Sequence, residues 1–235
     1  MTKEDVKKAM QPIADGLFGK QRTSYGQMPH YTVRPVEMIV EDLCAIPEEE
    51  WAYYAFSREP LNGKFSDAER LELTKQAIAC GRAYASRVLV AEFREPKTIH
   101  IFMDGVRKGE ELFAQHGVSA FMGEGFALAK LLLGHEIFHF VEEKYRKEIW
   151  TRTYRIRLWN VGPVKNTSTV MVLGEIAAMA FAKALTEITF SPYVLDAFLV
   201  YGYSPEAASG LYEEMMEKSG RTPRLPETEN AASED

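Results

Sequence analysis

The sequence has few cysteines and no excess of basic residues. Cys44 and Cys80 are its only cysteines among 235 residues, which is too few for a disulfide framework, and they lack the Cys-x-x-Cys spacing of a thiolate zinc site. A formal net charge of −6 at pH 7 argues against nucleic acid as the main partner, because phosphate contacts need a basic face. We therefore expect a cytoplasmic chain that binds no nucleic acid.

The sequence also shows no signal-peptide pattern and no long uncharged apolar run. Its first eight residues are mostly charged, and no apolar run of signal-peptide length follows them. The two longest apolar stretches, residues 125–141 and 170–190, contain ionisable residues, so each falls short of a clean membrane span. We interpret both as buried helices and expect no membrane partner.

The pattern of apolar residues predicts an α+β fold that is mainly helical, with a small sheet. With 46% apolar residues, the chain can build the core of one domain, expected over residues 1–220, before a disordered acidic tail over 221–235. Helices are expected over residues 3–17, from residue 47, over 66–93, 127–147 and 170–189, and after the Ser-Pro pairs at 191–192 and 204–205. Strands are expected over residues 36–40, 98–103 and 152–161, and a loop over 160–169.

One motif in the predicted helix 127–147 indicates metal chemistry. His135-Glu136-Ile137-Phe138-His139 places two histidines four residues apart, so both imidazoles lie on one helix face and can reach one metal ion. Glu136 lies next to that face and can act as general base on a metal-bound water. The alternative is a helix with two hydrogen-bonded histidines and a solvent-facing glutamate. Because most faces of this helix are apolar, a metal ion that satisfies all three polar groups is the more favourable interpretation.

A catalytic zinc site needs a third protein ligand and one open position. The metzincin extension of the motif would need Gly at 142 and His at 145, where this chain has Glu142 and Tyr145. Glu175 is the better candidate, because it is the only acid in the apolar stretch between Val170 and Leu185 and a buried carboxylate needs a cation or hydrogen-bond donors. A buried ion pair, for example with Arg155, remains the alternative for Glu175.

Residues 135–139 and 174–178 together resemble the zincin superfamily of metallopeptidases, and within it the gluzincin branch. The resemblance implies a zincin-like domain with the metal site on an active-site helix and one Zn²⁺ per chain. His135, His139 and Glu175 would be the ligands and Glu136 the general base. It also implies a peptide or small amide substrate that pairs with an edge strand, for which residues 98–103 are the candidate.

Other residues are weaker candidates for the site. His100 and His116 can assist there, and Tyr154, Tyr201 and Tyr203 are possible hydrogen-bond donors to an oxyanion; ordinary packing explains each of them as well. Two other functions stay open. The chain can be a non-catalytic metal-binding or regulatory module, or a di-iron carboxylate protein, although the latter needs a second Glu-x-x-His that the sequence lacks.

Overall fold

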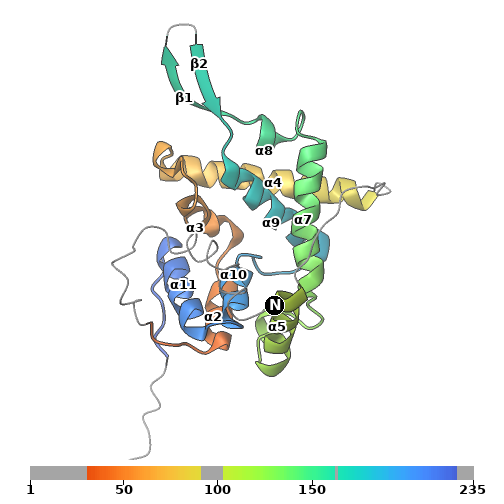
Figure 1. Cartoon of the computed structure of the whole chain (residues 1–235), viewed down its shortest axis with the longest axis vertical. Helices are drawn as coiled ribbons and strands as arrows, with labels where there is room; N and C mark the ends of the chain where they lie inside the picture. Colours follow the sequence, from red (N-terminus) through yellow and green to blue (C-terminus); the bar gives the residue numbers. More distant parts are fainter. Residues whose placement is uncertain (1–30, 91–102, 162–163, 227–235) are drawn as a thin grey trace, which may run out of the picture. The chain divides into compact units, whose positions relative to one another are not determined.

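Helices make up most of the part of the chain that the computed structural model describes, residues 31–90, 103–161 and 164–226 (Figure 1). The α-helices are α2 (Val36–Cys44), α3 (Ala52–Ser57), α4 (Asp67–Val90), α5 (Met103–Gln115), α6 (Ser119–Met122), α7 (Leu128–Lys144), α8 (Trp150–Thr153), α9 (Met171–Thr186), α10 (Val194–Tyr201) and α11 (Pro205–Lys218). The described residues also form the 3₁₀ helices η1 (Glu48–Trp51) and η2 (Asn62–Lys64) and the strands β1 (Ile156–Val161) and β2 (Val164–Ser168). The predicted α+β, mainly helical fold is confirmed.

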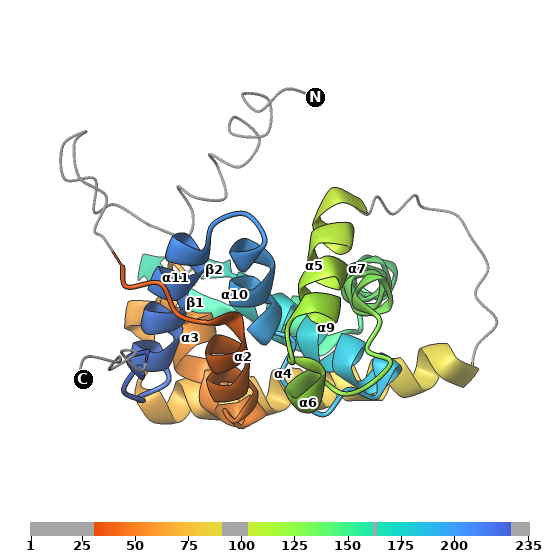
Figure 2. The same cartoon turned by 90° about the horizontal axis from the view of Figure 1, so that it is seen from below.

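Helix α9 packs against both α4 and α7, and it lies beside them in Figure 2. Small residues let the helices approach closely. A Cβ atom on Gly81 of α4 would lie 2.1 Å from the backbone oxygen of Ala177, and one on Gly134 of α7 would lie 3.3 Å from the Cα of Ala182. The rings of Phe138 and Phe181 pack at the α7–α9 contact, with centroids 5.5 Å apart. These contacts fix the position of α9 from two sides.

The N-terminal end of α9 is held by Glu59, which lies outside the helix. One carboxylate oxygen of Glu59 accepts a hydrogen bond from the backbone N–H of Val172 at 3.0 Å, and the other accepts from the N–H of Leu61 at 3.1 Å. Glu59 is only 6% exposed. A carboxylate there satisfies an unpaired N–H of the first turn and complements the helix dipole.

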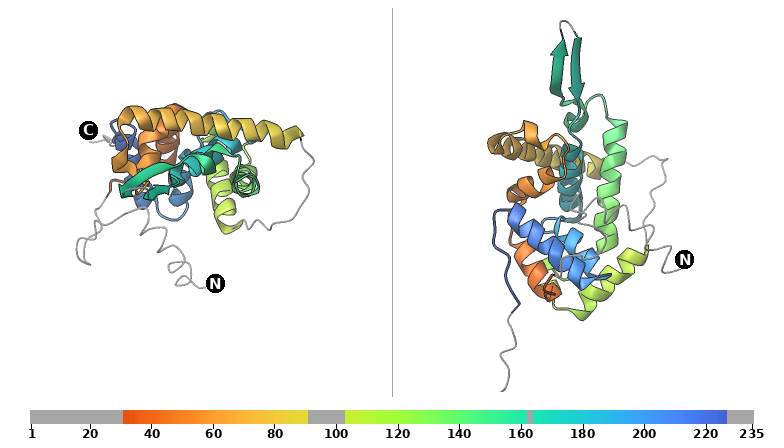
Figure 3. Two further views of the ribbon diagram at one scale, coloured as in Figure 1. Left: turned by 90° about the horizontal axis from the view of Figure 1, so that it is seen from above. Right: turned by 60° about the vertical axis from the view of Figure 1, so that its left-hand side comes forward.

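The two strands form one antiparallel hairpin between α8 and α9, which runs on from the N-terminal end of α9 in Figure 3. Ile156 pairs with Ser168 and Val161 with Val164, with an irregularity between Arg157 and Trp159. The hairpin and α8 make up the connection between α7 and α9. No helix among the described residues has the length and apolar character needed to cross a bilayer.

Most of the predicted helices are confirmed where the structure describes them. The capping box is present, because Glu69 accepts hydrogen bonds from the backbone N–H and the hydroxyl of Ser66 at 2.8 and 2.7 Å. Ser204 caps α11 by accepting from the N–H of Ala207, with Pro205 at the first helical position. The Ser-Pro pair at 191–192 was predicted to do the same for α10 and does not: α10 begins at Val194, with Tyr193 in the N-cap position and no side-chain cap.

The strand predicted over residues 36–40 is wrong, because these residues begin helix α2. Val36, Ile39, Val40 and Leu43 are buried, and their spacing of three and four residues fits one face of a helix rather than a strand. The loop predicted over 160–169 is wrong at 164–168, which form β2, and the strand predicted from residue 152 starts only after α8.

Several predicted segments lie wholly or partly outside the described residues, including residues 91–93 of the helix predicted over 66–93 and residues 162–163 of the loop predicted over 160–169. The helix over 3–17 is one, and residues 98–102 of the predicted edge strand are another; Met103, predicted to end that strand, instead begins α5. Of the predicted tail, residues 227–235 are not described. Residues 221–226 have no helix or strand, yet the guanidinium of Arg224 pairs with Asp42 and Glu41 at 2.7 and 2.6 Å.

Candidate metal centre

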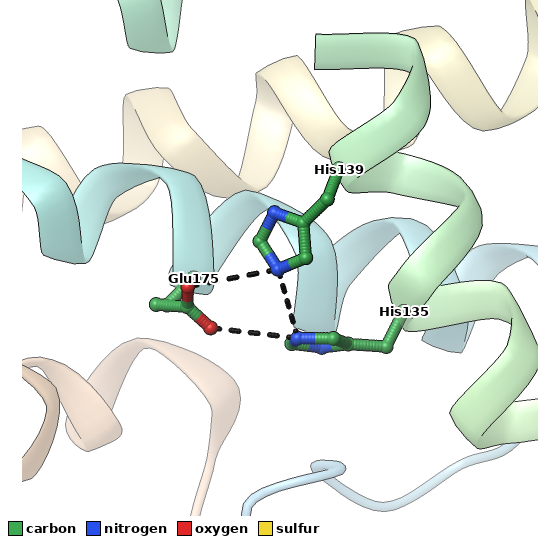
Figure 4. Close-up of side chains that lie close together, drawn as sticks. All are labelled: His135, His139 and Glu175. Carbon is green, nitrogen blue, oxygen red and sulfur yellow. Dashed lines mark hydrogen bonds and ion pairs between the residues drawn. The ribbon is translucent and has the colours of Figure 1, made fainter. Parts of the chain in front are cut away.

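His135, His139 and Glu175 point toward one another between α7 and α9 (Figure 4). The Nε2 atoms of the two histidines are 3.0 Å apart. One oxygen of Glu175 lies 3.4 Å from Nε2 of His135, and its other oxygen lies 3.6 Å from Nε2 of His139. The two histidines share a face because they are one helical turn apart, and the packing of α9 on α7 brings the carboxylate to them.

This donor set fits a zinc ion in both chemistry and spacing. Two imidazole nitrogens and one carboxylate oxygen are a common catalytic zinc set. Ligand atoms at about 2.1 Å from a tetrahedral ion lie about 3.4 Å from one another. The two Nε2 atoms are 3.0 Å apart, and they lie 3.4 and 3.6 Å from the two different oxygens of Glu175; one ligand atom from each of the three residues lies within 4.8 Å of the others. Within the described ranges, these three residues are the only group of histidines, cysteines and acids placed to hold a metal ion. The described residues contain no second group of this kind for an adjacent ion, as a di-iron site would need.

The group is open to solvent on one side. The side chain of Glu175 is 53% exposed, that of His139 is 30% and that of His135 is 18%. The expectation that Glu175 is a buried carboxylate is therefore wrong, since this residue lies at the solvent-facing edge of a mostly buried helix. An open side leaves room for the water and the substrate that a catalytic metal site needs.

The charges within the group stabilise one another. The imidazoles of His135 and His139 hold the pKa of the Glu175 carboxyl well below its usual range. The carboxylates of Glu142 and Glu175 raise the pKa of His139 to about 10, so that without a metal ion this imidazole is protonated at neutral pH. The alternative partner Arg155 binds instead the side chain and backbone oxygens of Thr167 in the hairpin.

Glu142 is a residue that the motif analysis missed. It is buried, and its carboxylate accepts from the hydroxyl of Thr151 at 2.6 Å and pairs with Arg152 at 3.0 Å. Its burial would raise the pKa of its carboxyl, but interactions with His139, Thr151 and Arg152 outweigh that effect and lower it. The sequence offers one signal for such a role, a glutamate one turn after the second histidine, where the side chains share a face.

Glu136, the predicted general base, lies on α7 between the two histidines and is exposed. Among the described residues, no side chain binds its carboxylate. The apolar character of the helix predicts that the three polar residues of the motif cannot all point freely to water; Glu136 does, whereas the side chains of His135 and His139 are only 18% and 30% exposed. The carboxylate of Glu136 is free to contact a molecule that enters from solvent.

The other predicted residues that the structure describes do not lie in the group. The hydroxyl of Tyr203 donates to Asp104 at 2.9 Å, the ring of Tyr201 packs on His116, and Nδ1 of His116 lies 2.8 Å from Glu37. Tyr154 packs on Trp150. His100 lies outside the described residues. The role of each in binding a transition state stays a prediction.

A small cavity lies next to α9 but cannot hold a substrate. It is lined by residues from η1, α3, α4, α9 and the segment before α10, among them Trp51, Thr74, Ile176, Ser191 and Tyr193. Its volume is about 10 Å³, which is room for a single water. Buried polar atoms of Trp51, Thr74, Ser191 and Tyr193 have no protein partner among the described residues, and a water there can bind to them.

No protein-family model, curated protein or solved structure matches this chain.

Proposed function

We propose that this protein is a zinc-dependent hydrolase that cleaves a peptide or small amide bond. His135, His139 and Glu175 would hold one Zn²⁺ per chain, with Glu136 as the general base. The single observation that supports this proposal most strongly is the convergence of two imidazole nitrogens and a carboxylate in a group open to solvent: the nitrogens lie 3.0 Å apart, and they lie 3.4 and 3.6 Å from the two oxygens of Glu175. The resemblance of residues 135–139 and 174–178 to gluzincin metallopeptidases supports it as well.

The reaction adds water across the carbon–nitrogen bond of an amide. A zinc ion, when bound, polarises the carbonyl and lowers the pKa of a water at the open position. The carboxylate of Glu136 takes a proton from the attacking water and gives it to the leaving nitrogen as the bond breaks. His135 and His139 have to be neutral to bind the metal, so binding displaces the proton that Glu142 and Glu175 hold on His139.

The first part of the test is metal content. After reconstitution with zinc and removal of excess, elemental analysis is expected to find about one zinc per chain, because three protein ligands suit a four-coordinate ion with one open position. Less than about 0.2 zinc per chain, or iron in pairs, contradicts the proposal.

The second part is hydrolysis, tested on a library of random peptides whose products are read by mass spectrometry. The zinc-loaded parent should produce new termini. Glu136→Gln should bind zinc as the parent does and produce none, because an amide cannot accept the proton. Glu143→Gln is the matched control, since Glu143 is exposed and pairs only with Arg146 among the described residues. Full activity in Glu136→Gln refutes the assigned base, and a zinc-loaded parent that cleaves nothing favours a non-catalytic module.

A further inference from the structure

Glu142 is held in one orientation by two residues of α8. Its side chain is 4% exposed, and acids this deeply buried are rare unless they are paired. The hydroxyl of Thr151 donates to Oε1 at 2.6 Å, and the guanidinium of Arg152 lies 3.0 Å from Oε2. A charged carboxylate with two fixed partners has little rotational freedom, so the fold determines which further group it faces.

The further group that the Glu142 carboxylate faces is His139. Oε2 of Glu142 lies 3.8 Å from Nδ1 of His139, whereas Nε2 of the same ring faces His135 and Glu175. The two nitrogens of this imidazole therefore face different partners. A histidine that binds a metal through one ring nitrogen usually directs the N–H of the other to a carboxylate or carbonyl, which fixes the tautomer and the ring orientation.

Gly174 links the same carboxylate to the third candidate ligand. A Cβ atom on Gly174 would lie 2.9 Å from Oε1 of Glu142 and 3.4 Å from Oε2, so a larger residue would displace the carboxylate. Gly174 directly precedes Glu175. Glu142 therefore packs against the backbone of α9 at the point where that helix presents Glu175, while it faces His139 on α7.

We propose that Glu142 is a positioning residue for the metal centre: it orients His139 so that Nε2 faces the ion, and Thr151, Arg152 and Gly174 keep it in place. This inference rests on the proposed function, because it needs the metal. It goes beyond the His-Glu-x-x-His motif, because Glu142 lies outside that motif on the same helix and is held by Thr151 and Arg152 of α8.

The test compares Glu142→Gln with Glu143→Gln, which changes the neighbouring but exposed glutamate. Zinc affinity is measured by competition with a chromophoric chelator, and the visible absorption spectrum is recorded after loading with Co²⁺. We expect Glu142→Gln to bind zinc about 10- to 100-fold more weakly with an altered Co²⁺ spectrum, and Glu143→Gln to match the parent in both. A merely structural role for Glu142 would lower stability without changing the Co²⁺ spectrum.

Thr151→Val serves as a second variant should Glu142→Gln fail to fold. It keeps the carboxylate but removes the donor at 2.6 Å, and we expect a smaller loss of zinc affinity with a spectral change of the same kind. If Glu142→Gln folds and has the zinc affinity and Co²⁺ spectrum of the parent, the inference is overturned and the proposed metal centre is unaffected. If Glu142→Gln does not fold, the same result in Thr151→Val overturns the inference. A parent that binds neither ion overturns both.

Discussion

Gly81→Ala is expected to destabilise the protein strongly, because there is no space for a methyl group where α4 crosses α9. The added Cβ would lie 2.1 Å from the backbone oxygen of Ala177 and 3.0 Å from the backbone nitrogen of Phe181. Ordinary contacts are at least about 3.4 Å, so the helices would have to separate by more than about 1 Å. Overpacking against side chains costs about 1–3 kcal/mol. Backbone atoms move less easily than side chains, and we expect the free energy of unfolding to fall by about 3 kcal/mol or more.

The sign of the change makes this a sharp test. In a helix interior with free space, Ala is more favourable than Gly by about 0.5–1 kcal/mol. Gly81→Ala would therefore raise the stability if there were space at the crossing, and lower it if there is none. The control is Gly63→Ala, where a Cβ would meet nothing within 4 Å and the expected change lies between zero and a gain of about 1 kcal/mol. Urea unfolding of the metal-free proteins, followed by circular dichroism, measures both. A Gly81→Ala variant as stable as the parent would refute the described crossing, and with it the support that places Glu175.

Three further predictions concern the site and its supports. In the metal-free protein, the pKa of His139 is raised from 6.5 to about 10. The contribution of His139 to stability is therefore full below about pH 6.5 and is lost as the pH rises toward about 10. The stabilisation by zinc should instead increase with pH, and urea unfolding with zinc or with a chelator measures both effects. Glu59→Ala should lower the free energy of unfolding by about 2–3 kcal/mol and weaken zinc binding, because it leaves the N–H groups of Val172 and Leu61 without their acceptor. The control Glu49→Ala, at an exposed position, should change neither quantity. Ser204→Ala should cost about 1 kcal/mol by removing the cap of α11, with zinc affinity unchanged.

The local part of the site could be predicted from the sequence. Two histidines four residues apart in a helix share a face whatever the rest of the fold does, and the structure places their nitrogens 3.0 Å apart. The structure also brings Glu175 to them, although the premise was wrong: its carboxylate is half-exposed rather than buried. The capping box at Ser66 and the cap at Ser204 were predictable for the same reason, since each depends on residues three positions apart.

The non-local part could not be predicted from one sequence. Glu59 and Gly81 matter because of residues far away in the chain, and their spacing carries no record of those contacts. The spacing of Glu142 from His139 is visible in the sequence, but its contacts with Thr151 and Arg152 are not. Helix α2 was mistaken for a strand because five residues with an apolar, β-branched character do not separate the two patterns; the burial of Leu43, beyond that window, decides it. Tertiary packing also overrode the Ser-Pro signal before α10.

The most direct test of the central claim is a crystal structure of the zinc-loaded protein with diffraction data collected at the zinc absorption edge. The account predicts one anomalous peak per chain, bonded to a ring nitrogen of His135, a ring nitrogen of His139 and a carboxylate oxygen of Glu175 at about 2.0–2.2 Å. A peak elsewhere, no peak, or a Glu175 carboxylate more than about 4 Å from the ion, well beyond any zinc–oxygen bond, would contradict it.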